Sequence, residues 1–187
     1  MKQLLLVFAV VALLGCGESA EEKAAKAKAA AADWKVIEAA IRKELKKPTG
    51  ELTKADLEKV TSLFLRNGFG NVYLNDNRLT SVKGLEKLTQ LTTLNLVDNK
   101  LTDVKGLEKL TQLKELSLGY NKLTSIKGLE KLTQLKELIL TDNKLTNVKG
   151  LEKLTQLVEL DLEDNPDLTE AQITELRKAL PKCRIQW

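Results

Sequence analysis

KGLEKLTQL stands unchanged at residues 83–91, 105–113, 127–135 and 149–157, so the same nine residues recur every 22 positions. A strict period of this length indicates a solenoid, in which no single repeat can bury its apolar side chains alone. One complete unit, residues 113–134, reads LKELSLGYNKLTSIKGLEKLTQ. Leu116-Ser117-Leu118 alternates apolar and polar side chains, which predicts a short strand in each coil. We therefore expect stacked coils with a parallel sheet along one face.

Two further positions of the unit have a structural explanation. An asparagine follows each predicted strand, at Asn77, Asn99, Asn121, Asn143 and Asn165. Because an amide both donates and accepts, this side chain can pair backbone groups of its own coil and of the neighbouring one. A glycine recurs at Gly84, Gly106, Gly128 and Gly150, where we expect a tight bend into the outer segment.

The unit resembles the leucine-rich repeat family, in the 22-residue class of internalin-like and phosphatase-regulator-like arrays. The matching positions in the third unit are Leu116, Leu118, Asn121, Leu123, Ile126, Gly128, Leu129 and Leu132. The resemblance implies an α/β fold, a leucine-rich-repeat solenoid with short parallel strands on its concave face. It covers residues 69–168, with about five strands. In similar bacterial surface proteins the concave face binds protein.

The segment before the array predicts a helical N-terminal cap over residues 33–68. Trp34, Ile37, Ile41 and Leu45 recur at the spacing of one helical face. Thr53 is then placed to cap a second, short helix, with Asp56 three residues later in a variant of the capping box.

The segment after the array predicts a C-terminal cap over residues 169–187. Thr169 and Gln172 have the spacing of a capping box. Ile173, Leu176 and Leu180 would then form the buried face of the helix, and CRIQW (183–187) would add a last strand or extended segment. Cys183 is interpreted as a buried apolar residue of this cap; pairing between molecules is the alternative.

One irregularity lies at the start of the array. VTSLFL (60–65) resembles the strand phrase, and FGNVYL (69–74) repeats it only nine residues later. Nine residues cannot form a coil, so either the two phrases form a hairpin through RNGFG (66–70) or nine residues are inserted into the first unit. The segment is either a structural element at the edge of the N-terminal cap or a recognition loop that exposes Phe69.

The first residues, MKQLLLVFAVVALLGC, predict export. The apolar run from Leu4 to Leu14 is too short for a bilayer, which needs about 20 residues, but it fits the apolar region of a signal peptide. Leu13-Leu14-Gly15-Cys16 resembles a bacterial lipobox, which implies that residues 1–15 are removed and that Cys16 carries lipid. An ordinary cleaved signal and a buried N-terminal helix are the alternatives.

This interpretation places the chain in the cell envelope, extracytoplasmic and held by a lipid anchor. Residues 16–32 comprise the lipidated Cys16 and an Ala-rich stretch with nothing to bury, which reads as a tether of coil or frayed helix. The residue directly after the cysteine is Gly17 and not Asp. By resemblance to Gram-negative lipoproteins, the lack of Asp at this position favours the outer membrane.

The composition argues against catalytic, metal-binding and cofactor-binding functions. The chain has no histidine, no phosphate-binding glycine loop and no Cys/His spacing suited to a metal, so we expect neither an enzyme, a metal site nor a cofactor. A net charge of +4, with lysine and glutamate interleaved, does not indicate nucleic-acid binding.

Binding remains as the expected function. The outward positions of the strands differ from unit to unit, whereas KGLEKLTQL does not. The predicted partner-binding residues on the concave face are Tyr73, Asn95, Glu115, Ser117, Tyr120, Glu137, Ile139, Glu159 and Asp161. The expected ligand is a protein, a peptide or a glycan, and we expect a monomer. The alternatives are a structural envelope spacer without a specific ligand and a regulatory subunit of an enzyme.

Overall fold

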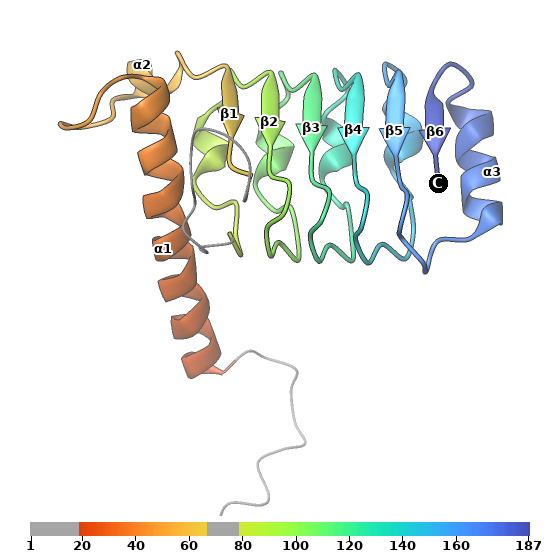
Figure 1. Cartoon of the computed structure of the whole chain (residues 1–187), viewed down its shortest axis with the longest axis horizontal. Helices are drawn as coiled ribbons and strands as arrows, with labels where there is room; N and C mark the ends of the chain where they lie inside the picture. Colours follow the sequence, from red (N-terminus) through yellow and green to blue (C-terminus); the bar gives the residue numbers. More distant parts are fainter. Residues whose placement is uncertain (1–18, 67–78) are drawn as a thin grey trace, which may run out of the picture.

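The computed structural model describes residues 19–66 and 79–187, which form a solenoid of stacked coils with a helix at each end (Figure 1). The strands are β1 (Ser62–Phe64), β2 (Thr93–Asn95), β3 (Glu115–Ser117), β4 (Glu137–Ile139), β5 (Glu159–Asp161) and β6 (Arg184–Gln186). The short 3-10 helices are η1 (Leu85–Lys87), η2 (Leu107–Lys109), η3 (Leu129–Lys131) and η4 (Leu151–Lys153). The α-helices are α1 (Ala20–Glu44), α2 (Lys54–Leu57) and α3 (Glu170–Ala179).

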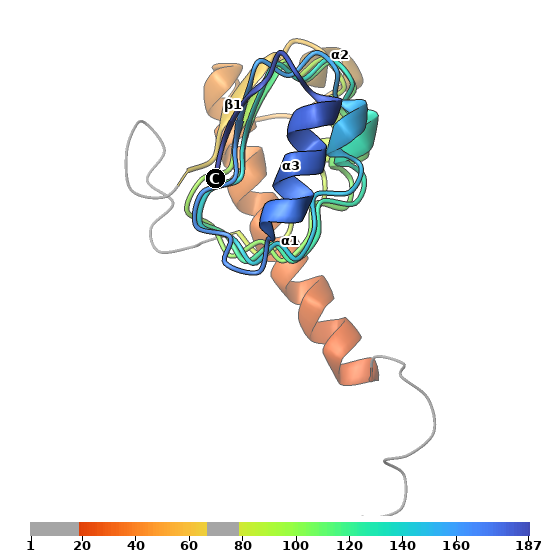
Figure 2. The same ribbon diagram turned by 90° about the vertical axis from the view of Figure 1, so that its right-hand side faces the viewer.

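The predicted fold class is confirmed. The six strands form one parallel sheet in the order of the sequence, and the 3-10 helices line the opposite side of the solenoid (Figure 2). The central strand leucines are in register from coil to coil, and they are fully or almost fully buried: Leu94, Leu116, Leu138 and Leu160. Each coil thus adds the same aliphatic layer to one continuous core.

The asparagine positions form a hydrogen-bonded ladder inside the solenoid. Asn121 is 7% exposed, and its Oδ1 accepts from the backbone N–H of Leu101 in the preceding coil at 3.0 Å. Its Nδ2 donates to the carbonyls of Leu96 and Leu118, each at 3.0 Å. Asn143 and Asn165 repeat this pattern and Asn99 follows it, which confirms the prediction for these four; Asn77 lies outside the described residues.

The predicted bend at the glycines is confirmed, because all four have φ between +105° and +110°. The side chain of the glutamate two residues after each glycine then caps the N-terminal end of the 3-10 helix. Glu108 Oε2 accepts from the backbone N–H of Gly106 at 2.6 Å, and Glu130 does the same for Gly128. Hydrogen bonds from backbone N–H groups lower the pKa of both carboxyls, so these glutamates remain ionised well below neutral pH.

Helix α1 closes the N-terminal end of the solenoid, and its predicted apolar stripe is confirmed. Ile37 and Ile41 are fully buried. The indole of Trp34 packs directly on Gly84, and the Lys87 ammonium lies 4.9 Å from the centroid of that ring. Asp33 is buried and accepts hydrogen bonds from the backbone N–H and the hydroxyl of Thr80.

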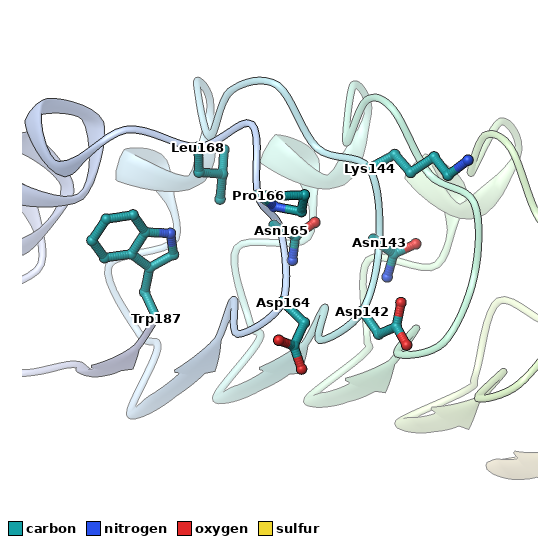
Figure 3. Close-up of a pocket in the computed structure, with 8 residues that line it drawn as sticks. All are labelled: Asp142, Asn143, Lys144, Asp164, Asn165, Pro166, Leu168 and Trp187. Atoms are coloured by element: carbon teal, nitrogen blue, oxygen red, sulfur yellow. The ribbon is translucent and has the colours of Figure 1, made fainter.

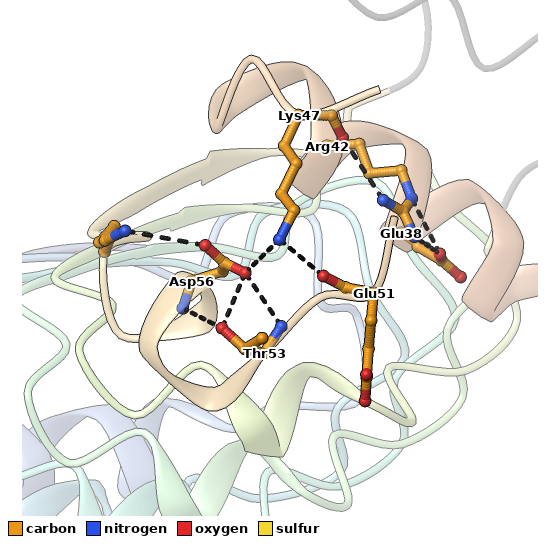
Figure 4. Close-up of polar contacts among 7 residues, drawn as sticks. Glu38, Arg42, Lys47, Glu51, Thr53 and Asp56 are labelled. Atoms are coloured by element: carbon orange, nitrogen blue, oxygen red, sulfur yellow. Dashed lines mark hydrogen bonds and ion pairs between the residues drawn. The ribbon is translucent and has the colours of Figure 1, made fainter. Parts of the chain in front are cut away.

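A polar cluster fixes the turn between α1 and α2 (Figure 4). Thr53 and Asp56 form the predicted capping box, and Lys47 Nζ donates to Asp56 Oδ2 at 2.7 Å. Hydrogen bonds from Lys47 and Thr53 hold the pKa of Asp56 far below its usual range. Arg42 pairs with Glu38 one turn earlier on α1, at 2.7 Å.

The C-terminal cap also follows the prediction. Thr169 and Gln172 form a capping box, and Gln172 reaches back to donate to the carbonyl of Thr146. β6 is the predicted last strand. Cys183 is half-buried, and burial, together with the nearby charge of Glu159, raises the pKa of its thiol, so that it remains protonated near neutral pH.

The first unit is longer than the others. Ser62 of β1 pairs with Thr93 of β2, 31 positions later, whereas paired residues of β2 to β5 are 22 positions apart. The difference of nine agrees with the insertion, one of the two alternatives that the sequence left open. β1 thus begins the sheet within the segment predicted as the helical cap, and Phe69 with the rest of 67–78 lies outside the described residues.

Within residues 19–66 and 79–187, no helix has the length and apolar character needed to cross a membrane.

Candidate functional site

The concave face consists of the outward side chains of β2–β5 and of the turn that follows each of these strands. It has sixteen positions in four rows, one position from each coil. The first row is Thr93, Glu115, Glu137 and Glu159, and the second is Asn95, Ser117, Ile139 and Asp161. The third row is Val97, Gly119, Thr141 and Glu163, and the fourth is Asp98, Tyr120, Asp142 and Asp164. Because the register is fixed at 22 residues, each row runs straight along the solenoid.

The structure brings together seven of the predicted site residues in the first two rows: Asn95, Glu115, Ser117, Glu137, Ile139, Glu159 and Asp161. All are exposed or half-buried, while the leucines between them face the core. Glu115 accepts from the hydroxyl of Thr93 at 3.2 Å, and Glu159 lies 3.9 Å from the Arg184 guanidinium of β6.

Tyr73 was predicted on the concave face, in the strand before β2. In the structure Ser62 and Phe64 of β1 occupy the positions next to Thr93 and Asn95, because the insertion shifts the first unit by nine residues. Tyr73 itself lies outside the described residues.

Tyr120 is placed by an unusual backbone conformation. Its φ is +57°, and its side chain is 55% exposed. The same turn position in the other described coils holds Asp98, Asp142 and Asp164, also at positive φ. Aspartate tolerates this left-handed region better than a bulky residue does, so the tyrosine costs backbone energy that its neighbours avoid.

Gly119, next to Tyr120, is buried and packs closely against the following coil. A Cβ on Gly119 would stand 3.3 Å from the carbonyl oxygen of Thr141 and 3.7 Å from the side chain of Ile139, so only glycine leaves this contact undisturbed. Thr141 is 9% exposed, and within the described part of the chain its Oγ1 has no hydrogen-bond partner. A buried hydroxyl without a partner costs about 1–3 kcal/mol.

A hollow of about 680 Å³ adjoins the fourth row near the C-terminal end (Figure 3). Its lining is Asp142, Asn143, Lys144, Asp164, Asn165, Pro166, Leu168 and Trp187. Trp187 was predicted only as part of the cap, yet its ring is 41% exposed and forms one wall. Sequence reasoning missed this site because the ring comes from a segment outside the repeat period.

The arrangement offers contacts for binding another molecule. In residues 19–66 and 79–187, no three acidic or cysteine side chains gather in a way that could hold a metal ion. The concave face instead combines carboxylates, one exposed tyrosine and a half-buried isoleucine, which suits recognition of another molecule.

A family model described as leucine-rich repeats matches residues 71–109, 89–131, 111–147 and 133–178, more than half of the chain. This chain is a leucine-rich repeat protein. Members of the family are typically interaction modules that bind proteins and that have no catalytic activity of their own.

Solved structures of similar leucine-rich repeat proteins include two internalins of Listeria monocytogenes. The internalin InlF is 29% identical, with a TM-score of 0.71 over 81% of this chain and 42% of its own. Internalin C2 is 27% identical, with a TM-score of 0.67 over 81% of this chain and 62% of its own. A leucine-rich repeat protein of Leptospira interrogans is 26% identical, with a TM-score of 0.54 over 74% and 40%.

The chain thus spans less than two thirds of each of these proteins. The comparison with curated proteins gave no match.

Proposed function

We propose that this leucine-rich repeat protein is a lipid-anchored lipoprotein of the bacterial cell envelope that binds a partner protein through its concave face. It acts as a binding or scaffold module on the extracytoplasmic side and is not itself an enzyme. The family supports the binding role. The LLGC sequence at 13–16 supports the anchor, by its resemblance to a lipobox.

The observation that carries the binding role is Tyr120. An exposed aromatic ring is kept in a left-handed turn where three other coils use aspartate. Tyrosine supplies a large contact area and is enriched among residues that dominate binding energy. A residue that costs folding energy and presents an aromatic ring to solvent is better explained by a partner than by the solenoid.

Replacing Tyr120 with asparagine, together with Glu137→Gln, tests this role. Asparagine suits the left-handed turn, so we expect the free energy of unfolding to stay the same or to rise by up to about 1 kcal/mol. Capture of the partner from native envelope extract should fall by about tenfold or more. Tyr120→Phe is the control, because it keeps the ring and should retain most of the capture.

Undiminished capture by the double variant would contradict the role of the concave face. If neither the wild type nor the Phe variant captures any protein, the envelope-spacer function becomes the better explanation. A change in the activity of a captured enzyme would instead support the regulatory subunit.

The direction of helix α1 agrees with a tether at its N-terminal end. Residues 19–32 are almost entirely exposed, and this part of α1 extends beyond the solenoid for about 20 Å at 1.5 Å per residue. In Figure 2 it leaves on the side of the 3-10 helices, away from the strands. An anchor at this end would leave the concave face free for a partner.

Replacing Cys16 with serine tests the anchor. Without the thiol no lipid can be attached, so we expect the chain to move from the membrane fraction to the soluble extracytoplasmic fraction. Cys183→Ser is the matched control, since it removes the other cysteine and should leave the chain in the membrane fraction. Complete membrane retention of the Cys16 variant would refute the lipoprotein assignment.

A further inference from the structure

We infer that the concave face and the hollow beside Trp187 bind a lysine- or arginine-rich segment of the partner. This inference rests on the proposed binding function and names the chemistry of the ligand. Eight of the sixteen positions of the concave face are carboxylates, and none is Lys or Arg: Asp98, Glu115, Glu137, Asp142, Glu159, Asp161, Glu163 and Asp164. The chain as a whole carries a net charge of +4, so the net charge of the concave face is opposite in sign to that of the rest of the chain.

The carboxylates of the first row repel one another in the free protein. Glu115, Glu137 and Glu159 lie directly opposite one another in neighbouring strands, at the strand spacing of about 4.8 Å. Like charges opposite each other destabilise a sheet. Arg184 pairs with Glu159 at 3.9 Å only at the end of this row. A cationic ligand laid along the row would relieve repulsion that the fold itself leaves uncompensated.

The hollow adds a second feature that suits a basic side chain. Asp142 and Asp164 line it together with the exposed ring of Trp187 (Figure 3), and neither carboxylate forms an ion pair with another described residue. A lysine or arginine head is attracted both by carboxylates and by the face of an indole. The apolar atoms of Pro166 and Leu168 offer a surface for its aliphatic stem.

Lys144 is the one cation among the residues that line the hollow, and Figure 3 shows its side chain extending away from the two aspartates. The space between the aspartates and Trp187 therefore remains open for a cation from outside.

The test uses the full chain and a fluorescein-labelled peptide in which lysine alternates with alanine. The wild type should bind it, and binding should weaken steeply when salt rises from about 0.05 M to about 0.5 M, as expected for exposed charges. The triple variant Glu115→Gln/Glu137→Gln/Glu159→Gln should lose about tenfold in affinity. Its melting temperature should be unchanged or higher, because the repulsion is gone, so that misfolding cannot explain the loss.

The matched control is Glu21→Gln/Glu44→Gln/Glu51→Gln, which removes the same charge from exposed positions outside the concave face and the hollow. It should bind the peptide as the wild type does. Trp187→Ala should weaken binding while Trp187→Phe largely preserves it.

Four outcomes would overturn the inference. The first is equal binding of a peptide with glutamate in place of lysine, and another is equal binding by the two triple variants; in either case the proposed function would stand if the Tyr120→Asn/Glu137→Gln variant still lost capture of the partner. A third is no binding of the lysine peptide at all. The last is salt-dependent self-association of the wild type that the concave triple variant abolishes, since the face would then belong to a second copy of this chain.

Discussion

Replacing Asn143 with alanine should lower the free energy of unfolding by about 3 kcal/mol, measured by urea denaturation. Asn143 is 3% exposed, and its Oδ1 is the acceptor for the backbone N–H of Leu123 at 2.9 Å. Its Nδ2 donates to the carbonyls of Leu118 and Leu140. Alanine would leave the N–H of Leu123 buried without a partner, and it would also interrupt the ladder between the third and the fourth strand.

The matched control is Asn147→Ser in the same coil. Asn147 is exposed, and its side chain accepts only from the nearby N–H of Lys149, as Ser81 and Ser125 do at the equivalent positions. The free energy of unfolding of the Asn147→Ser variant should therefore differ from that of the wild type by less than about 0.5 kcal/mol. Equal effects at Asn143 and Asn147 would show that the internal ladder contributes little.

Replacing Gly84 with alanine should be far more destabilising than replacing Gly106 with alanine. Both glycines have nearly the same positive φ, so the backbone strain is shared. A Cβ on Gly84 would lie 2.2 Å from Trp34 Cε3, whereas a Cβ on Gly106 would meet nothing closer than 3.7 Å. The added methyl should therefore push the indole out of its place and detach α1 from the first coil, at a cost of about 3 kcal/mol.

A double-mutant cycle with Trp34→Ala isolates this contact. In the Trp34→Ala background, Gly84→Ala should cost no more than Gly106→Ala, because the clashing ring is absent. The measurements are thermal melts and, in a Trp187→Phe background, the fluorescence of Trp34, which should report a more solvent-exposed indole in Gly84→Ala. Equal effects of the two glycine substitutions in the wild type would contradict the proposed closing role of Trp34.

Most of the fold could be predicted from the sequence because each 22-residue unit repeats the same pattern of buried and exposed residues. The strand leucines, the inward asparagines and the glycines at positive φ each followed from a single unit, and the capping residues at Thr53 and Thr169 followed from local chemistry. The start of the sheet did not, since two similar phrases compete there. The pairing of Ser62 with Thr93 shows that the first phrase, VTSLFL, forms the strand next to β2. Such long-range pairing cannot be predicted from the local sequence of either phrase.

The candidate site was predictable only where the repeat period reaches it. The first two rows were assigned correctly from Glu115 to Asp161 because the outward positions of a strand alternate with the buried ones. The left-handed backbone at Tyr120 and the unpaired hydroxyl of Thr141 depend on the local geometry of the turn. Trp187 joins the site only because β6 pairs with β5 and carries the chain end beside the fourth row.

The identical boundaries between coils also bear on how this protein can change over generations. Each boundary joins the same leucines, the same asparagine bonds and the same glutamate-capped glycine, at a register of 22 residues. Recombination between two neighbouring copies of KGLEKLTQL would therefore insert or delete one whole coil and recreate an existing boundary. Every such event would alter the reach of the concave face by one strand, about 4.8 Å, and would leave both caps in place.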